Sequence, residues 1–333
     1  MNVKERTIPL RILKDEALLR NISPQNPAYS EIESDYYRRK AGYWGETQID
    51  YYLRLLPQQD KYYILNDLRL PFKGYFFQID SLIVTTRYCL VIESKNIKGT
   101  LFFDGVFDQL IRINDDTEEA FEDPITQAKN IILQLKEILI ELIPSLPFDY
   151  IVSIASHKTI LKTDAKTMKR VFHASSLVQK IIELDGYYTD EVIKIDDIEE
   201  VCNFLLKLHS PAQQNIAEIY RLTERDILKG VLCGKCRGKM VFVKYRWVCC
   251  QCDHCSQDAH LQKLMDYLLI FRPFITNKQL RTFLEIPSRR VANRILKNSG
   301  LTWSGEGKAR VYFAPTSLIP NNILFAEGEQ DEI

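Results

Sequence analysis

The stretch FFQIDSLIVTTRYCLVIESKN, residues 76–96, reads as two apolar strands joined by a tight turn, yet it carries charged side chains into the expected core. Alternate residues of a strand share a face, so Glu93 and Lys95 point to the same side. If residues 86–87 form a two-residue turn, the pairing places Asp80 directly opposite Glu93. The sequence therefore predicts a hairpin that brings carboxylates and an ammonium group together.

Such a cluster needs something to offset its cost. Like charges opposite each other on paired strands are destabilising, and a buried carboxylate without a partner costs several kcal/mol. A divalent cation such as Mg²⁺ or Mn²⁺ takes oxygen ligands and serves phosphate chemistry, so it would offset that cost. The alternative is a salt bridge from Lys95 to Glu93 or Asp80 at a sheet edge.

Two further polar residues are candidates for the same site. Glu46 lies at helical spacing from Ile49 and Leu53, so this carboxylate sits on an apolar helix stripe; the alternative is a helix-end acid with its own cap. Gln127 lies in the first turn of a helix predicted to begin at Asp123 as N-cap, where polar residues are more often solvated than functional. Glu46 is the third acid expected to face this core, after Asp80 and Glu93, and three acids favour a metal site over a salt bridge.

Composition indicates a globular chain of 333 residues, 46% apolar, with two or more domains. The charged N-terminus has no apolar segment typical of a signal peptide, and the most apolar helical stretch is too short to span a bilayer. We therefore expect a cytoplasmic protein with no membrane partner, in which cysteines are metal-bound or free.

The net charge of zero conceals an asymmetry. Residues 230–315 contain 15 Lys or Arg and 5 Asp or Glu, a net charge of +10, so the remainder carries −10. Segregated basic charge is typical of a nucleic-acid-binding module, although a solvated basic face without a partner is the alternative.

Strand-like runs at residues 61–70, 75–85 and 88–96 precede a hairpin over residues 99–113, with Asp104 and Gly105 as its turn signal, and an acidic loop over residues 115–123. A long helix, two short strands near residues 149–155 and 169–172, and further helices follow. This order predicts an α/β domain with a mixed sheet.

The motifs GETQID (45–50), QIDSLIV (78–84), IESKN (92–96) with Gly99, and DPITQA (123–128) together resemble the nuclease-related domain (NERD) of bacterial proteins. The resemblance covers residues 38–145 and, more loosely, residues 146–220. That family is similar to PD-(D/E)xK nucleases, so the resemblance implies a restriction-endonuclease-like mixed sheet flanked by helices.

The resemblance also implies roles for the residues of the hairpin. Asp80 and Glu93 would bind Mg²⁺ or Mn²⁺, joined by the backbone carbonyl of Ser94. Glu46 would complete the metal site directly or through water, and Gln127 would support it. Lys95 would orient the attacking water and stabilise charge on the phosphate, as metal-assisted phosphodiester hydrolysis requires.

Cysteines predict a second metal site. CGKC at 233–236 and CCQCDHC at 249–255 fit a structural zinc ribbon, which is a folding device for a segment too short to build its own core. We favour Cys233, Cys236, Cys249 and Cys252 as ligands; Cys250, His254 or Cys255 are alternatives, and a disulfide framework is another. Some NERD members carry a similar ribbon, matched here by Trp247, Cys249, Cys252, Ser256 and residues 258–260.

The basic C-terminal part, residues 276–313, reads as a helix, a tight turn, a second helix with Ser288 as N-cap, and two strands. This order predicts a winged helix-turn-helix, with a plain helical subdomain or protein-docking surface as the alternative. The side chains expected to contact nucleic acid are Arg289, Arg290, Asn293, Arg294, Lys297 and, in the wing, Lys308.

The predicted organisation is an arm (1–29), a nuclease-like domain (30–229), a zinc ribbon (230–262), a winged-helix-like module (263–316) and an acidic tail (317–333). We expect a metal-dependent nuclease with DNA as its substrate. A non-catalytic nucleic-acid-binding or regulatory protein with a vestigial nuclease fold is the alternative.

Overall fold

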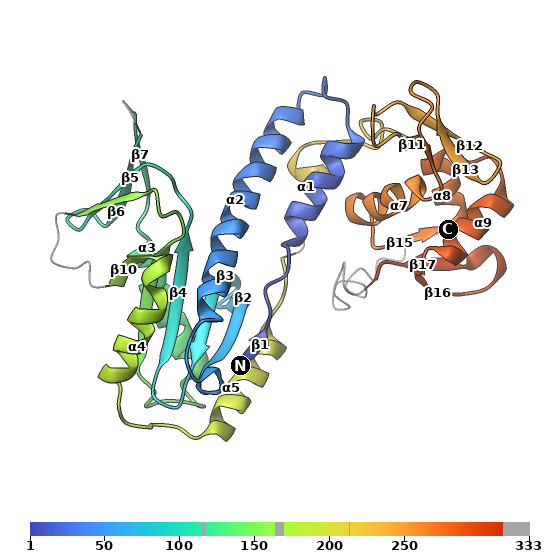
Figure 1. Ribbon diagram of the computed structural model, residues 1–333. Coiled ribbons are helices and arrows are strands. Elements are labelled where there is room, and N and C mark those ends of the chain that lie inside the picture. Colours follow the sequence, from blue (N-terminus) through green and yellow to red (C-terminus); the bar gives the residue numbers. More distant parts are fainter. Residues whose placement is uncertain (115–116, 164–169, 213, 316–333) are drawn as a thin grey trace. The chain divides into compact units, whose positions relative to one another are not determined.

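The computed structural model describes residues 1–114, 117–163, 170–212 and 214–315 (Figure 1). The chain divides into two compact units: unit 1 holds residues 1–7 and 39–212, and unit 2 holds residues 8–38 and the chain from residue 213.

This division differs from the predicted boundaries. Residues 8–38, expected in an arm and in the nuclease-like domain, belong with the C-terminal part, because α1 (Leu10–Asn21) packs against α7 (Ala259–Ile270). The expected polar arm is thus partly structured, and the predicted acidic tail lies outside the described residues.

Unit 1 is built on a six-stranded mixed sheet in the order β1-β2-β3-β4-β8-β10 (Figure 1). Strands β2, β3 and β4 are antiparallel neighbours, whereas β1 runs parallel to β2 and β8 runs parallel to both β4 and β10. The strands are β1 (Asn2–Lys4), β2 (Tyr63–Phe72), β3 (Tyr75–Val84), β4 (Cys89–Lys95), β8 (Phe148–Ile154) and β10 (Val171–His173). The prediction of an α/β domain with a mixed sheet is confirmed.

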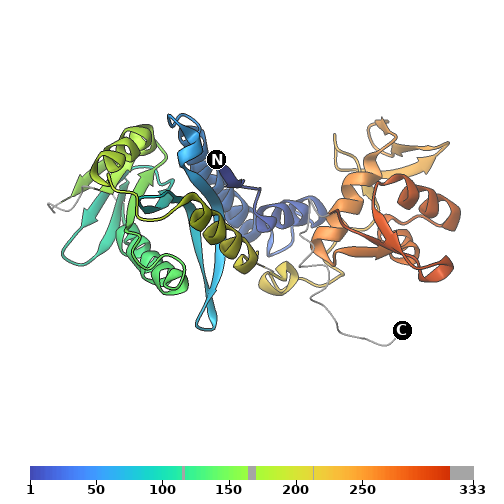
Figure 2. The ribbon, with the colours of Figure 1, turned by 90° about the horizontal axis from the view of Figure 1, so that it is seen from below.

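Helices cover both faces of this sheet (Figure 2). On one face, α3 (Pro124–Leu139) and α5 (Ile195–Leu208) bury an apolar stripe against β2, β3 and β4. On the other face lie the C-terminal half of α2 (Tyr29–Leu53) and α4 (Leu177–Tyr187). Charged side chains near the C-terminal end of β4 are therefore surrounded by packed elements.

A second, four-stranded sheet has the order β7-β6-β5-β9. Its strands are β5 (Thr100–Asp104), β6 (Gln109–Asn114), β7 (Thr117–Glu122) and β9 (Ile160–Thr163). The predicted hairpin is confirmed as β5 and β6, and Asp104 begins its turn by accepting N–H bonds from Val106 and Phe107. The prediction of a loop over residues 115–123 was wrong for Thr117–Glu122, because that segment pairs along β6; residues 115–116 lie outside the described part.

Unit 2 contains two small sheets and a set of helices that share one core. The sheets have the orders β11-β12-β13-β14 and β15-β17-β16. Their strands are β11 (Val231–Leu232), β12 (Lys239–Val243), β13 (Arg246–Cys249), β14 (Cys255–Ser256), β15 (Phe274–Thr276), β16 (Thr302–Ser304) and β17 (Val311–Phe313). Beside α1, the start of α2 and α7, the helices are α6 (Ile216–Ile219), α8 (Asn277–Leu284) and α9 (Arg289–Asn298).

Short 3₁₀ turns occur at η1 (Gln59–Lys61), η3 (Ala174–Ser176) and η4 (Gly307–Ala309). In the described part of the chain, no helix is long and apolar enough to cross a membrane.

Candidate functional site

The hairpin of β3 and β4 has the predicted register. Ser81 pairs with Ile92, and the Thr85 N–H donates to the carbonyl of Tyr88 at 3.0 Å, as a two-residue turn requires. The same register continued by one residue puts Asp80 beside Glu93. Asp80 Oδ2 accepts the N–H of Ser94 at 2.8 Å, which ties this carboxylate to β4.

Lys95 lies between the hairpin and α3. Its Nζ donates to Glu93 Oε1 at 2.8 Å and to Gln127 Oε1 at 2.7 Å. Gln127 in turn donates to Glu122 at 2.7 Å. The Asp123 carboxylate caps α3, as predicted, and so fixes the helical turn that carries Gln127. The structure thus brings three of the expected site residues into one hydrogen-bonded chain.

Glu46 reaches the sheet because α2 approaches it closely at Gly45. A Cβ atom at Gly45 would stand 2.6 Å from the Cβ of Asn96, just beyond β4, so a side chain there would push the helix away. The glycine of the GETQID motif therefore has a packing role.

Arg6 was not foreseen from the sequence, and it is the main cation at Glu46. Its side chain is 2% exposed, and its Nη1 donates to Glu46 Oε2 at 2.5 Å. Its Nε donates to Asp50 at 3.0 Å, and its Nη2 donates to the Asp80 carbonyl at 2.7 Å and to Ser81 Oγ at 2.9 Å. Asp50 had a sequence signal, since it lies one helical turn after Glu46. Arg6 follows β1 and had none.

Electrostatics at this site favour an added cation. Burial, then the charge of Asp80, raises the pKa of Glu46 to about 8. Burial and Asp80 also raise the pKa of Glu93 to about 7, against the opposing effect of Lys95. The pKa of Asp80 itself is raised by burial. Burial is the largest cause of all three shifts, and the charge of Asp80 adds to it at Glu46 and Glu93; a divalent cation would stabilise the ionised carboxylates.

The donor set fits a hard cation, since Mg²⁺ and Mn²⁺ prefer carboxylate and carbonyl oxygens. With Arg6 on Glu46 and Lys95 on Glu93, however, the three carboxylates do not form a close ligand set. Across the described ranges, one group of three or more His, Cys, Asp or Glu residues has all its ligand atoms within 4.8 Å of one another, and it is made of cysteines.

That group consists of Cys233, Cys236, Cys249 and Cys252. The Sγ atoms of Cys233 and Cys252 are 3.7 Å apart, and those of Cys236 and Cys249 are 3.4 Å apart. A tetrahedral zinc ion with Zn–S bonds of about 2.3 Å requires S–S separations of about 3.8 Å, so the residues fit such an ion. The alternatives Cys250 and Cys255 are exposed and lie outside the group.

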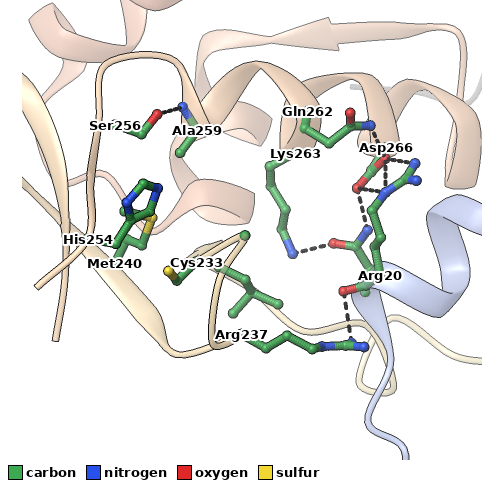
Figure 3. A pocket seen from close by; sticks show the side chains of 13 residues that line it. Arg20, Cys233, Arg237, Met240, His254, Ser256, Ala259, Gln262, Lys263 and Asp266 are labelled. Carbon is green, nitrogen blue, oxygen red and sulfur yellow. Dashed lines mark hydrogen bonds and ion pairs between the residues drawn. The ribbon is translucent and has the colours of Figure 1, made fainter. Parts of the chain in front are cut away.

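Residues around the cysteines hold the small sheet in place. Trp247 donates to His260 Nδ1 at 2.9 Å, and Ser256 Oγ accepts the N–H of Ala259 at 2.9 Å at the start of α7. A pocket of about 360 Å³ lies beside Cys233 (Figure 3). Its charged groups are already paired within the protein, as in the ion pair of Arg20 with Asp266 at 2.7 Å.

Along α9, the predicted inward face is largely as observed. Ile295 and Leu296 are buried, Val291 is partly buried, and Ala292 completes this face. Ser288 caps the helix by accepting the N–H of Val291 at 3.3 Å. The residues expected to contact nucleic acid are all exposed: Arg289, Arg290, Asn293, Arg294, Lys297 and, in η4, Lys308.

Unit 1 is thus an α/β domain with a mixed sheet and with Asp80, Glu93 and Lys95 close together at the end of a central hairpin. Residues 41–155, which carry this constellation, match the family model of the nuclease-related domain (NERD). The match supports the resemblance drawn from the four motifs. No curated protein and no solved structure matches the chain significantly.

Proposed function

We propose that the chain is a divalent-metal-dependent nuclease that hydrolyses phosphodiester bonds of DNA. The observation that carries this proposal is the register of β3 and β4, which puts Asp80 beside Glu93 with Lys95 bonded to Glu93. Two carboxylates and an ammonium group at one edge suit metal-assisted attack of water on a phosphodiester. The nuclease-related match over residues 41–155 supports the same function.

In the proposed site, Asp80 and Glu93 would hold Mg²⁺ or Mn²⁺ together with the carbonyl of Ser94, and Glu46 would complete the site directly or through water. When bound, the cation stabilises the phosphoryl oxygens as a Lewis acid and lowers the pKa of the attacking water. Lys95 orients that water and stabilises negative charge on the phosphate.

Two neighbours position these groups. Gln127 accepts from Lys95 at 2.7 Å, so it holds the ammonium group at the hairpin. Arg6 binds one oxygen of Glu46, which leaves the other oxygen of that carboxylate for the cation or its water. Both act through a residue of the proposed site.

The proposed targeting part is unit 2. We assign residues 230–262 as a zinc ribbon held by Cys233, Cys236, Cys249 and Cys252, and residues 263–316 as a winged-helix-like module. The order α7, β15, α8, α9, β16 and β17 supports this assignment, because a capped helix pair is followed by a two-stranded wing. The exposed basic side chains of α9 suit contacts with phosphates and base edges.

A second candidate function is non-catalytic binding of nucleic acid. It is favoured by the ion pairs of Lys95 with Glu93 and of Arg6 with Glu46, which neutralise part of the acidic cluster without a metal. In that case the hairpin is a structural ion-pair network.

Cleavage of DNA by the full zinc-loaded chain distinguishes the two functions. Supercoiled and linear single-stranded DNA are incubated with and without Mg²⁺ or Mn²⁺, with wild type, Asp80→Asn and Lys95→Ala. A nuclease shows metal-dependent cleavage that falls by at least about 100-fold in both variants while DNA binding persists. Lys98→Ala is the matched control, because Lys98 is an exposed lysine close to Lys95 in the sequence. This variant should cleave DNA as wild type does.

Binding without cleavage by every form would support the second function. If wild type neither binds nor cleaves any nucleic acid, both functions are refuted.

A further inference from the structure

The turn between β12 and β13 has an unusual backbone. Val243 pairs with Arg246, so Lys244 and Tyr245 form a two-residue turn. Their φ angles are 46° and 68°, which places both in the left-handed region. Turns of this kind strongly prefer Asn-Gly, because side chains with a Cβ are strained there. An aromatic residue at the second position is therefore held at a cost in stability.

The side chain at this costly position is displayed to solvent. Tyr245 is 71% exposed, whereas Trp247 on the neighbouring strand is buried in the core of unit 2. The ring contributes little to the core that holds the sheet, so packing does not account for its place. A strained backbone that presents an exposed side chain points to a function for that side chain.

The turn lies beside α9 within unit 2 (Figure 1). The guanidinium carbon of Arg294 is 4.6 Å from the centre of the Tyr245 ring and 5.9 Å from that of Phe242. This stacking orients the ring, and an arginine that stacks through its plane still offers N–H groups to a phosphate. Arg294 is one of the side chains of α9 proposed to contact nucleic acid, and it also contacts the turn.

Charge around the turn has one sign. Lys244 and Arg246 flank Tyr245 and are exposed, and the stretch from residue 231 to residue 252 contains no Asp or Glu. A basic surface with a protruding aromatic ring is the combination that binds unpaired nucleotides, since cations hold the backbone while a base stacks on the ring. In duplex DNA the bases are stacked on each other and offer no free face to such a ring.

We infer that the β12–β13 turn is a second nucleic-acid contact, in which Tyr245 stacks on an unpaired base next to a duplex held by α9. The preferred ligand of unit 2 is then a junction of double-stranded and single-stranded nucleic acid. This inference rests on the proposed nucleic-acid binding of α9. It narrows the proposed ligand of unit 2 from nucleic acid in general to such junctions.

Trp303 in β16 repeats the arrangement at the other hairpin of unit 2. It is 56% exposed, and the guanidinium of Arg310 lies 4.1 Å from its ring centre. A second exposed ring under an arginine gives the single strand another stacking position.

The experiment measures binding of the full zinc-loaded chain, without added Mg²⁺, to three labelled DNA probes by fluorescence anisotropy. The probes are a blunt duplex, one of its strands alone, and the same duplex with a single-stranded tail. Wild type is compared with Tyr245→Gly and Tyr245→Phe. The glycine variant removes the ring and suits the left-handed backbone, so it should fold at least as well as wild type.

The expected result is that wild type binds the tailed duplex more tightly than the blunt duplex. Tyr245→Gly should bind the tailed duplex roughly 5- to 100-fold more weakly and change blunt-duplex affinity by less than about twofold. Its melting temperature should equal or exceed that of wild type, and Tyr245→Phe should retain the preference for the tail.

Three results would overturn the inference: equal affinity of wild type for tailed and blunt duplexes, equal weakening of both by Tyr245→Gly, or a lower melting temperature of Tyr245→Gly. The last would make the ring a packing element. Failure of wild type to bind any probe would instead refute the proposed targeting by α9, so the two failures are distinguishable.

Discussion

Replacing Arg6 by methionine should destabilise unit 1 in a way that a divalent cation reverses. The guanidinium of Arg6, 2% exposed, is the shared ion-pair partner of Glu46 and Asp50, whose side chains are 19% and 16% exposed. Methionine keeps most of the buried length of the side chain but leaves both carboxylates without this cation.

The magnitude follows from the contacts. Removing one partner of a buried ion pair costs about 3–5 kcal/mol. Part of that cost is relieved here, because the pKa of Glu46 is already about 8 with Arg6 in place, so the carboxyl group can take up a proton at neutral pH. We therefore expect Arg6→Met to lower the free energy of unfolding of unit 1 by about 2–4 kcal/mol.

Mn²⁺ should offset this loss in the variant, because it can bind the two released carboxylates. A site saturated at 100 times its dissociation constant is stabilised by about 2.7 kcal/mol. In wild type, Arg6 already neutralises Asp50 and one oxygen of Glu46, so the same Mn²⁺ concentration should stabilise unit 1 less.

Hydrogen-exchange mass spectrometry in urea is the suitable assay, since peptides from β3 and β4 report on unit 1 alone. Arg11→Met is the matched control: Arg11 is likewise a buried arginine, paired with Asp15 at 2.9 Å, but it lies in unit 2. It should destabilise peptides of unit 2 and leave the exchange of the β3 and β4 peptides unchanged. A loss below about 0.5 kcal/mol in Arg6→Met, or equal Mn²⁺ stabilisation of wild type and variant, would refute the reasoning.

Three further predictions concern other parts of the chain. Cys236→Ser should abolish stoichiometric zinc binding and unfold the β11–β14 sheet, whereas Cys250→Ser should retain zinc. A metal-release assay with a chromogenic chelator measures the bound zinc. Loss of zinc in both variants would contradict the ligand set. Burial and the charge of Lys4 lower the pKa of His209 to about 4, so the histidine is neutral when folded and the unfolded state binds more protons below pH 6.5. The free energy of unfolding should therefore fall as the pH drops from 6.5 to 4, by about 1 kcal/mol once partial exposure of the side chain is allowed for. In urea titrations over this pH range, His209→Gln should show a smaller fall than wild type, and an equal fall would refute this prediction. Gly45→Ala should cost about 1–3 kcal/mol in thermal unfolding despite the better helix propensity of alanine, and a stabilised variant would show that α2 shifts freely.

The hairpin could be predicted from sequence because its determinants are local. A side-chain period of two and a two-residue turn fix which residues face each other, and these rules put Asp80 beside Glu93 without knowledge of the rest of the fold. Glu46 could be placed on the same core because helical spacing links it to Ile49 and Leu53.

The partners of these residues could not be predicted because they are distant in sequence. Arg6 bonds to residues 40 and 75 positions away, and no periodic pattern connects them. The link from Gln127 to Lys95 spans 32 positions, so it required the packing of α3 on β4.

The cysteine register shows a different limit. Two overlapping C-x₂-C pairs left Cys249 and Cys255 equally available by spacing. The ladder decides between them, because Met240 pairs with Cys249 and so turns its Sγ to the same side as the buried Met240 side chain, whereas Cys255 is exposed.

Each unit combines two separate stretches of the chain, and this affects the order in which its parts are synthesised. Arg20 of α1 and its partner Asp266 of α7 are 246 residues apart. At a synthesis rate of about 5–20 residues per second, α1 waits roughly 12 to 50 seconds for the helix that covers it. Unit 1 has all of its residues well before then. Leu18 and Ile22 are fully buried in the folded protein. During this interval the residues of α7 that belong to the same core have not yet been synthesised. The helix α1 thus leaves the ribosome long before α7, the helix against which it packs.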